Sequence, residues 1–271
     1  MTTLEKQVQD FKNKIENLDS TKQKTACRTL LKELDSKYSL STVRTKLTSY
    51  RKALMPINEE LKDVLKISKK KQGKLQSKHR KTIAKTNRKL KPVRKYRAMI
   101  QCAERMLKND NVSDITAGLC LLTGRRMSEV LKTAKFTNRS NNTNKAYFSG
   151  QLKSKGTDKQ KDKVAIYTLV DRAIIKEATK RLRQLCDTSK LTTEQINRKY
   201  ESSVNSACWS SFDMYIGKCT SHDLRKVYGA ICREWYKPAE QSDNSFLASI
   251  LGHSSEDLNT VNSYNKYYLK K

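Results

Sequence analysis

The hydrophobic residues in the first part of the chain recur every three or four positions, the spacing that places side chains on one face of a helix. One stripe covers residues 4–18 and a second covers residues 26–34, with the polar break Asp19-Ser20-Thr21 between them. A third stripe spans residues 43–50, and Ser41 before it is a residue type that caps helix starts. This pattern predicts a small helical module.

The same spacing continues in the rest of the chain and gives way once to the alternating pattern of strands. The expected helices cover residues 96–107, 112–122, 127–134, 172–186, 194–210, 223–235 and 246–251. Residues 146–152 and 163–169 predict two short strands around a lysine-rich connection. We therefore expect a mainly α protein with one small antiparallel β-sheet.

Prolines indicate where the chain divides. Pro56, followed by Asn58, is expected to open a basic helix, and Pro92 is expected to form a hinge after it, because proline lacks the backbone donor and restricts the preceding residue. The predicted organisation is a helical, strongly basic module with its linker helix over residues 1–91 and a second domain over residues 92–271.

The charge of the chain narrows the choice of partner. Its 57 Lys and Arg against 27 Asp and Glu give a net charge of +30, which favours a polyanion such as nucleic acid. Basic residues are densest between residues 62 and 97, where Asp63 is the single acid. Apolar residues punctuate this run, so we expect a helix whose basic face follows DNA phosphates. The candidate contacts are Lys69, Lys70, Lys71, Lys74, Lys78, Arg80, Lys81, Lys85, Arg88, Lys89, Arg94 and Lys95.

Hydrophobic runs and cysteine spacing bear on the cellular location of the protein and on whether it binds a metal. It has no run of eighteen apolar residues and no signal-peptide layout, and its seven cysteines form no Cys-x-x-Cys pair, so a cytoplasmic protein with reduced thiols is expected. Cys208, Cys219 and His222 lack a fourth ligand, which argues against a structural zinc. We expect no metal.

Four short motifs in the second part of the chain carry side chains that can bind or attack a phosphate. Taken singly, each also fits an ordinary surface helix, turn or tyrosine cluster. They are TGRRMSEV at residues 123–130, GQLKSKG at 150–156, HDLR at 222–225, and LGH at 251–253 with SYNKYY at 263–268.

In their order, these motifs resemble the catalytic domain of the tyrosine recombinases. The sequence segments FSGQLKSKG, HDLRKVYGAICREWY and SYNKYYL are most similar to those of the telomere resolvases, or protelomerases, which form covalently closed hairpin ends on linear replicons. The resemblance covers roughly residues 96–271. It implies a tyrosine recombinase-like catalytic domain preceded by a helical DNA-binding module.

The resemblance also implies residue roles. The Thr-Gly-x-Arg-x-x-Glu motif places the first catalytic arginine at Arg126, with Arg125 a neighbouring phosphate contact, and Tyr264 is the expected nucleophile. Tyr264 lies eleven residues after His253, about two more than is common, so Tyr267 and Tyr268 stay open. The hairpin lysine is Lys153, with Lys155 as the alternative. The remaining catalytic positions are His222, Arg225 and His253.

These residue types suit strand cleavage through a phosphotyrosine. A phenol, whose ordinary pKa is about 10, attacks phosphorus only when the developing charge is balanced, and arginines and histidines supply fixed donors for that charge. The expected activity is resolution of replicated inverted-repeat ends without metal, ATP or another cofactor, by a homodimer on double-stranded DNA. A conventional site-specific recombinase or integrase is the first alternative, and a non-catalytic DNA-binding protein is the second.

Overall fold

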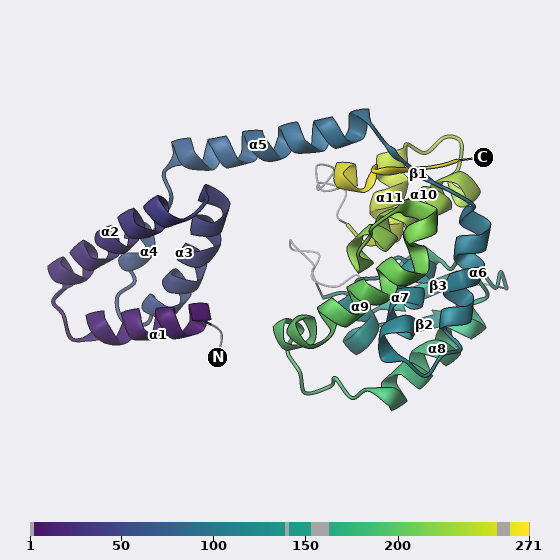
Figure 1. The fold of residues 1–271 in the computed structure, drawn as a ribbon, viewed down its shortest axis with the longest axis horizontal. Coiled ribbons are helices and arrows are strands. Elements are labelled where there is room, and N and C mark those ends of the chain that lie inside the picture. The colour runs from purple at the N-terminus through teal and green to yellow at the C-terminus, as the bar shows by residue number, and fades with distance from the viewer. Residues whose placement is uncertain (1–2, 139–140, 153–162, 254–260, 271) are drawn as a thin grey trace. The chain divides into compact units, whose positions relative to one another are not determined.

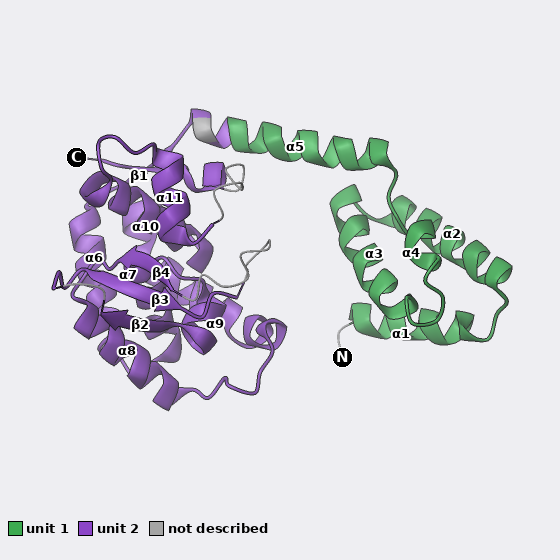
Figure 2. Cartoon of the chain, turned by 180° about the vertical axis from the view of Figure 1, so that it is seen from behind, with its two compact units in different colours: residues 1–84 green, residues 85–271 purple. Residues whose placement is uncertain are grey.

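The computed structural model describes residues 3–138, 141–152, 163–253 and 261–270 (Figure 1). The chain forms two compact units, residues 1–84 and residues 85–271 (Figure 2). Each unit has its own hydrophobic core, built around Leu47 and Leu54 in the first and around Leu119 and Phe212 in the second.

The first unit is a small helical module, as the apolar stripes predict. Asp19 accepts a hydrogen bond from the backbone of Lys22 at 2.9 Å and so caps α2, while Ser39, rather than the expected Ser41, caps α3. Buried aliphatic side chains on every helix close the core. The helices are α1 (Thr3–Glu16), α2 (Ser20–Lys37), α3 (Leu40–Leu54) and the short α4 (Leu61–Val64).

The basic helix starts later than the prolines predict. α5 spans Lys69–Arg88, after α4, because Leu61 and Leu65 are buried in the core of the first unit and hold the chain there. The side chains described along α5 are exposed or half-buried. Its buried contacts are few, so it is a largely solvated helix that presents cations.

The second unit is organised around α7 (Val112–Thr123), which is apolar on all sides and buried from Ile115 onward. None of the described helices, α7 included, has both the length and the hydropathy that a membrane span requires. The helices that pack against α7 are α6 (Tyr96–Met106), α8 (Arg172–Leu185), α9 (Thr193–Ile216) and α10 (Ser221–Tyr236).

A three-stranded antiparallel sheet packs beside these helices. Its order is β2-β3-β4, formed by Lys135–Asn138, Lys145–Ser149 and Val164–Tyr167, and β4 lies against α11 (Asp243–Leu251). Residues 146–152 and 163–169 were expected to contain strands and do; β2 was not expected. The expectation of a mainly α protein with a small antiparallel sheet is confirmed.

The chain at Pro92 is a strand rather than a hinge. Lys91–Val93 (β1) pairs in parallel with Tyr267–Leu269 (β5), and Val93 is fully buried. Proline is tolerated in a two-stranded sheet because such strands have an open edge. The pairing joins the segment after α5 to the segment that follows Tyr264.

Gly124 ends α7 with a left-handed backbone, φ 66°, and an added Cβ would lie 2.2 Å from the Tyr228 ring. Gly124→Ala should therefore lower the free energy of unfolding of the second unit by about 2–4 kcal/mol, from overpacking and left-handed strain. Trp209 and Trp235, the two tryptophans of the chain, both lie in this unit, so urea unfolding followed by tryptophan fluorescence reports on it.

Gly73→Ala is the matched control, because Gly73 lies on α5 in the first unit with nothing within 4 Å of an added Cβ. It should leave the fluorescence transition unchanged. Equal transitions for Gly124→Ala and wild type would contradict the assignment of Gly124 to a strained, close-packed helix end.

Candidate active site

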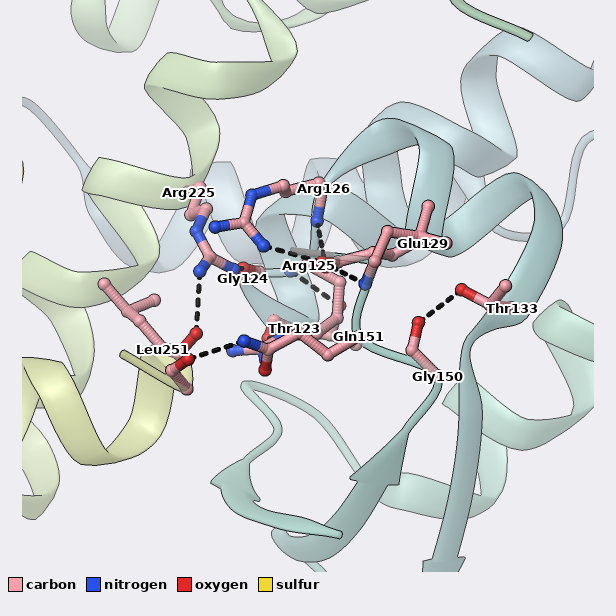
Figure 3. A network of polar contacts seen from close by, with 12 residues as sticks. Thr123, Gly124, Arg125, Arg126, Glu129, Thr133, Gly150, Gln151, Arg225 and Leu251 are labelled. Atoms are coloured by element: carbon pink, nitrogen blue, oxygen red, sulfur yellow. Dashed lines mark hydrogen bonds and ion pairs between the residues drawn. The ribbon is translucent and has the colours of Figure 1, made fainter. Parts of the chain in front are cut away.

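Three separate segments meet around one buried guanidinium, two through backbone carbonyls and one through a side chain. Arg225 lies on the second turn of α10, near the helix start that carries His222. Its Nη2 donates to the carbonyl of Leu251 at 2.7 Å (Figure 3), and its Nη1 donates to the carbonyl of Gly124. Its Nε donates to the Tyr264 hydroxyl at 3.3 Å. Arg225 therefore joins the ends of α7 and α11 to the predicted nucleophile.

Tyr264 ends a 3₁₀ turn, Asn262–Tyr264, and is 4% exposed. The centroid of its ring lies 5.9 Å from that of His222 and 5.3 Å from that of His253. The other two candidates lie on β5, where Tyr267 is buried and Tyr268 is 42% exposed. Of the three tyrosines, Tyr264 is the one whose described contacts include Arg225 and both histidines.

Arg126 and Glu129 form an ion pair at the start of the next helical segment. The Arg126 Nη1 lies 2.6 Å from Glu129 Oε1, and the Arg126 backbone donates to Oε2 at 3.0 Å. Glu129 is fully buried on the π-helical turn Glu129–Thr133, whereas Arg126 keeps partial exposure. Burial opposes ionisation of Glu129, but the charges of Arg225, Arg126 and Arg125 outweigh it and lower its pKa.

Arg125 occupies the core, not the phosphate-facing surface that its place in the motif suggests. Its side chain is fully buried, donates to the carbonyls of Thr123 at 3.2 Å and Ile250 at 2.6 Å, and lies over the Phe148 ring at 4.6 Å. Burial lowers its pKa to about 10, and the charge of Arg225 adds to this effect. In this structure Arg125 packs the scaffold, and its role as a phosphate contact stays a prediction.

The hairpin lysines Lys153 and Lys155 lie outside the described residues. The base of that hairpin is described and lies at the site, because Gln151 donates to the carbonyl of Gly252 at 2.6 Å and the Leu152 backbone donates to Glu129 at 3.4 Å. Thr133 also donates to the carbonyl of Gly150 (Figure 3).

His222 lies among cations and is neutral at pH 7. Partial burial, followed by the charges of Lys226 and Arg225, lowers its pKa to about 4. A neutral imidazole has one N–H for a phosphate oxygen and one acceptor nitrogen. A bound phosphate would add negative charge beside the ring and favour its protonation.

The cysteines near His222 do not resemble a metal site. Cys208 and Cys219 are both buried, and the Cys219 thiol donates to the carbonyl of Cys208 at 3.4 Å. Burial raises the pKa of Cys219 to about 12, which disfavours the thiolate that binds zinc. Among the residues that the structure describes, no group of three or more His, Cys, Asp or Glu could hold a metal ion.

The twelve predicted DNA contacts between Lys69 and Lys95 fall on α5 and on the segment after it. All except Lys71 are exposed, and Lys71 pairs with Asp35 inside the first unit. The Arg94 backbone donates to the Tyr215 carbonyl at 2.9 Å, and Lys95 adopts a left-handed backbone, φ 44°, before α6. Lys95 and Arg94 are thus held in place by the second unit, with their side chains outward.

Sequence reasoning missed Gln151, Asp223 and Lys266 as parts of the site. Asp223 accepts from Lys266 Nζ at 2.8 Å and from the Thr220 backbone at 3.3 Å. The Thr220-x-x-Asp223 spacing is that of a reciprocal cap and could have located the start of α10. The sequence contains no signal for the Lys266 or Gln151 contacts, since their partners lie 43 and 101 residues away.

The pKa of His222 gives a test of the site in the absence of DNA. A pH titration of the histidine resonances by NMR should show an apparent pKa for His222 below about 5.5, since partial exposure screens some of the neighbouring charge. The chain has three histidines, and loss of one resonance in His222→Gln assigns it. A phosphate-containing DNA ligand should raise this pKa, and a free-protein value at or above 6.5 would contradict the arrangement.

The family model for the telomere resolvase ResT/TelK catalytic domain matches residues 87–267. Comparison with curated protein sequences gives no significant match.

Solved structures of protelomerases share the fold. A structure of protelomerase TelA covalently complexed with substrate DNA is 22% identical, with a TM-score of 0.91 over 99% of this chain and 89% of that one. A TelA mutant complexed with DNA hairpin product gives 22% and 0.90, over 98% and 88%. Protelomerase TelK complexed with substrate DNA gives 18% and 0.63, over 98% and 58%. Because the family model spans most of the chain, the protein belongs to the telomere resolvase family, as the sequence resemblance predicts.

Proposed function

We propose that the protein cleaves and rejoins DNA as a telomere resolvase, converting replicated inverted-repeat ends into covalently closed hairpins. The observation that carries this proposal is the contact between Tyr264 and Arg225, with both histidines beside the ring, in a chain of this family. Arg126 lies close enough for its charge to lower the pKa of His222. The TelA structures described as a covalent complex with substrate DNA and as a complex with hairpin product support it.

In the cleavage step, the Tyr264 hydroxyl gives its proton to solvent and its oxygen forms a bond to phosphorus, while the bond between phosphorus and the 5′-oxygen breaks. The product is a 3′-phosphotyrosyl enzyme and a strand with a free 5′ end. Arg126 and Arg225 supply donors for the non-bridging oxygens, an effect of about 3–4 kcal/mol for each well-placed donor in comparable sites. His222 adds a neutral N–H donor, and His253 is assigned the same role.

Lys153 is assigned as the acid that gives a proton to the departing 5′-oxygen. Attack of another 5′-hydroxyl on the phosphotyrosine reverses the same step, regenerates the phenol and closes the strand. The phosphotyrosyl bond conserves the energy of the broken phosphodiester, so rejoining needs no ATP. Protein cations carry the charge stabilisation in this scheme, which therefore includes no metal ion.

We assign DNA binding to the exposed lysines and arginines of α5 and the segment that follows it. The proposed working form is a homodimer, since an inverted repeat and a twofold dimer share one symmetry. In this proposal residues 1–91 act as the DNA-binding module and residues 92–271 as the catalytic domain, in the cytoplasm with the replicon.

The product of the reaction tests the activity. Incubation of the protein with a duplex that carries a replicated inverted-repeat end should yield two hairpin-ended molecules on a denaturing gel, and a nicked suicide substrate should trap a covalent protein–DNA band. Tyr264→Phe should abolish both while DNA binding persists, and Tyr268→Phe is the matched control that should retain both.

Exchange of strands between two plasmids would instead identify a conventional recombinase. Binding without strand breakage by the wild-type protein on its own inverted repeat would identify a DNA-binding protein. An undiminished covalent band from Tyr264→Phe would overturn the assignment of the nucleophile.

The role of α5 gives a second prediction. Lys74 and Lys78 are exposed one helical turn apart and, within the described part of the chain, form no ion pair. If each contacts a phosphate, replacing both by Gln should weaken DNA binding and reduce the slope of log K against log salt by about 1.8, from about 0.9 per phosphate. The cleavage rate of the bound complex should change little.

Lys62→Gln with Lys66→Gln is the control pair, because these lysines already pair with Glu59 and Asp63. It should change the salt slope less. Equal slopes for the two pairs, or a loss of cleavage rate at saturating DNA in the Lys74 and Lys78 variant, would contradict the assignment of α5 to binding alone.

A further inference from the structure

The position of Tyr264 depends on the residues that follow it. The Lys266 backbone donates to the Tyr264 carbonyl at 2.9 Å, and the Lys91 backbone donates to the Lys266 carbonyl at 2.9 Å. β5 then begins at Tyr267. Lys266 is thus the junction between the turn that carries the predicted nucleophile and the strand that fixes the end of the segment.

The side chain of Lys266 connects this junction to the helix that carries the other site residues. Its Nζ lies 2.8 Å from Asp223 Oδ1, and the two side chains are 22% and 14% exposed. Asp223 directly follows His222 and precedes Arg225 by two positions on the first turns of α10. Burial opposes ionisation of Asp223, but hydrogen bonds and charges from Lys266 and Lys226 prevail and lower its pKa to about 2. The ion pair is therefore present throughout the neutral range.

We propose that Lys266 is a positioning residue for strand cleavage, which holds Tyr264 at the reacting distance by its ion pair with Asp223. The hydrogen bond from Arg225 to the Tyr264 hydroxyl measures 3.3 Å, at the long end of the normal range, and is a weak restraint by itself. Two residues of chain span at most about 7 Å. Holding Lys266 on the first turn of α10 therefore limits how far Tyr264 can move from Arg225 and His222.

The positive charge of Lys266 is paired with a carboxylate within the protein. Asp223 accepts from Lys266 and is also 3.3 Å from Lys226, so the carboxylate lies between two cations. Lys226 lies on α10 itself, three residues from Asp223, and its ion pair reaches no part of the tyrosine segment. The two lysines share one acceptor atom, Asp223 Oδ1, and differ in whether they connect two segments.

This difference provides a matched experiment, and the inference rests on the proposed function because the readout is formation of the phosphotyrosyl adduct. The rate of adduct formation is measured in single turnover at saturating suicide DNA, and the Kd for the same DNA is measured separately. Lys266→Met should slow adduct formation by about 10- to 100-fold, the loss that follows from a displaced nucleophile, with Kd changed less than about threefold. Lys226→Met removes one of the cations that lower the His222 pKa, but burial and Arg225 keep His222 neutral at pH 7, so this variant should stay within about threefold of wild type in both. Lys266→Arg should recover most of the rate.

A substrate with sulfur at the bridging 5′ position separates positioning from proton donation, because a thiolate leaves without a proton. Lys266→Met should remain slow relative to wild type on this substrate. Full recovery would show that Lys266 is a proton donor and would overturn the inference, as would equal slowing by Lys226→Met or a loss confined to Kd.

Failure of the proposed function gives a different result, since wild-type protein would then form no adduct at all. Tryptophan fluorescence during urea unfolding checks that the second unit of each variant folds. If Lys266→Met does not fold, Lys266→Gln replaces it, because the amide keeps a hydrogen-bond donor, one bond shorter than lysine, without the charge. Lys266→Gln should form the adduct at a rate between those of wild type and Lys266→Met. If Lys266→Gln reacted as fast as wild type and as fast as Lys266→Arg, the ion-pair mechanism would be contradicted.

Discussion

Burial of the Arg225 charge is the constraint on which the rest of the site depends. A buried guanidinium is stable only if its donors are satisfied and its charge is balanced. Here the acceptors are carbonyls at the ends of α7 and α11, where helix dipoles place partial negative charge, and the Tyr264 hydroxyl. Buried Glu129 adds a full negative charge. One side chain thus fixes two helix ends relative to α10 and contacts the predicted nucleophile.

The same electrostatic balance separates the roles of neighbouring arginines. Arg125, Arg126 and Arg225 together carry three positive charges, which Glu129 offsets by one. Arg125 satisfies part of its need in the core through two carbonyls and the Phe148 ring, and Arg126 keeps access to solvent. The site therefore holds an excess of fixed positive charge before DNA arrives, and a phosphate that enters meets donors already held by the fold.

Much of this organisation could be predicted from the sequence, because helix spacing and motif order are local signals. The structure contains the predicted helices at residues 96–107, 112–122 and 172–186, with small shifts at their ends. The family predicted from the motifs is confirmed by the family-model match. β1 and β5 could not be predicted, since a three-residue strand has no periodicity and its partner lies far along the chain. The burial of Arg125 was missed for a related reason: neighbouring arginines in one motif look alike until tertiary packing assigns them to opposite environments.

The two-stranded sheet explains why the segment after α5 cannot be a free linker within the second unit. The Lys91 backbone donates to the Lys266 carbonyl, and the Lys270 backbone donates to the Val93 carbonyl at 3.0 Å, so β1 holds both ends of the strand that follows Tyr264. Val93 is fully buried, and releasing β1 would expose it and break these hydrogen bonds together. The Lys266–Asp223 ion pair acts on the same short segment from α10. The segment that carries the predicted nucleophile is therefore held by β1 on one side and by α10 on the other, through residues distant in sequence. The position of Tyr264 depends on these tertiary contacts of the second unit more than on the local turn.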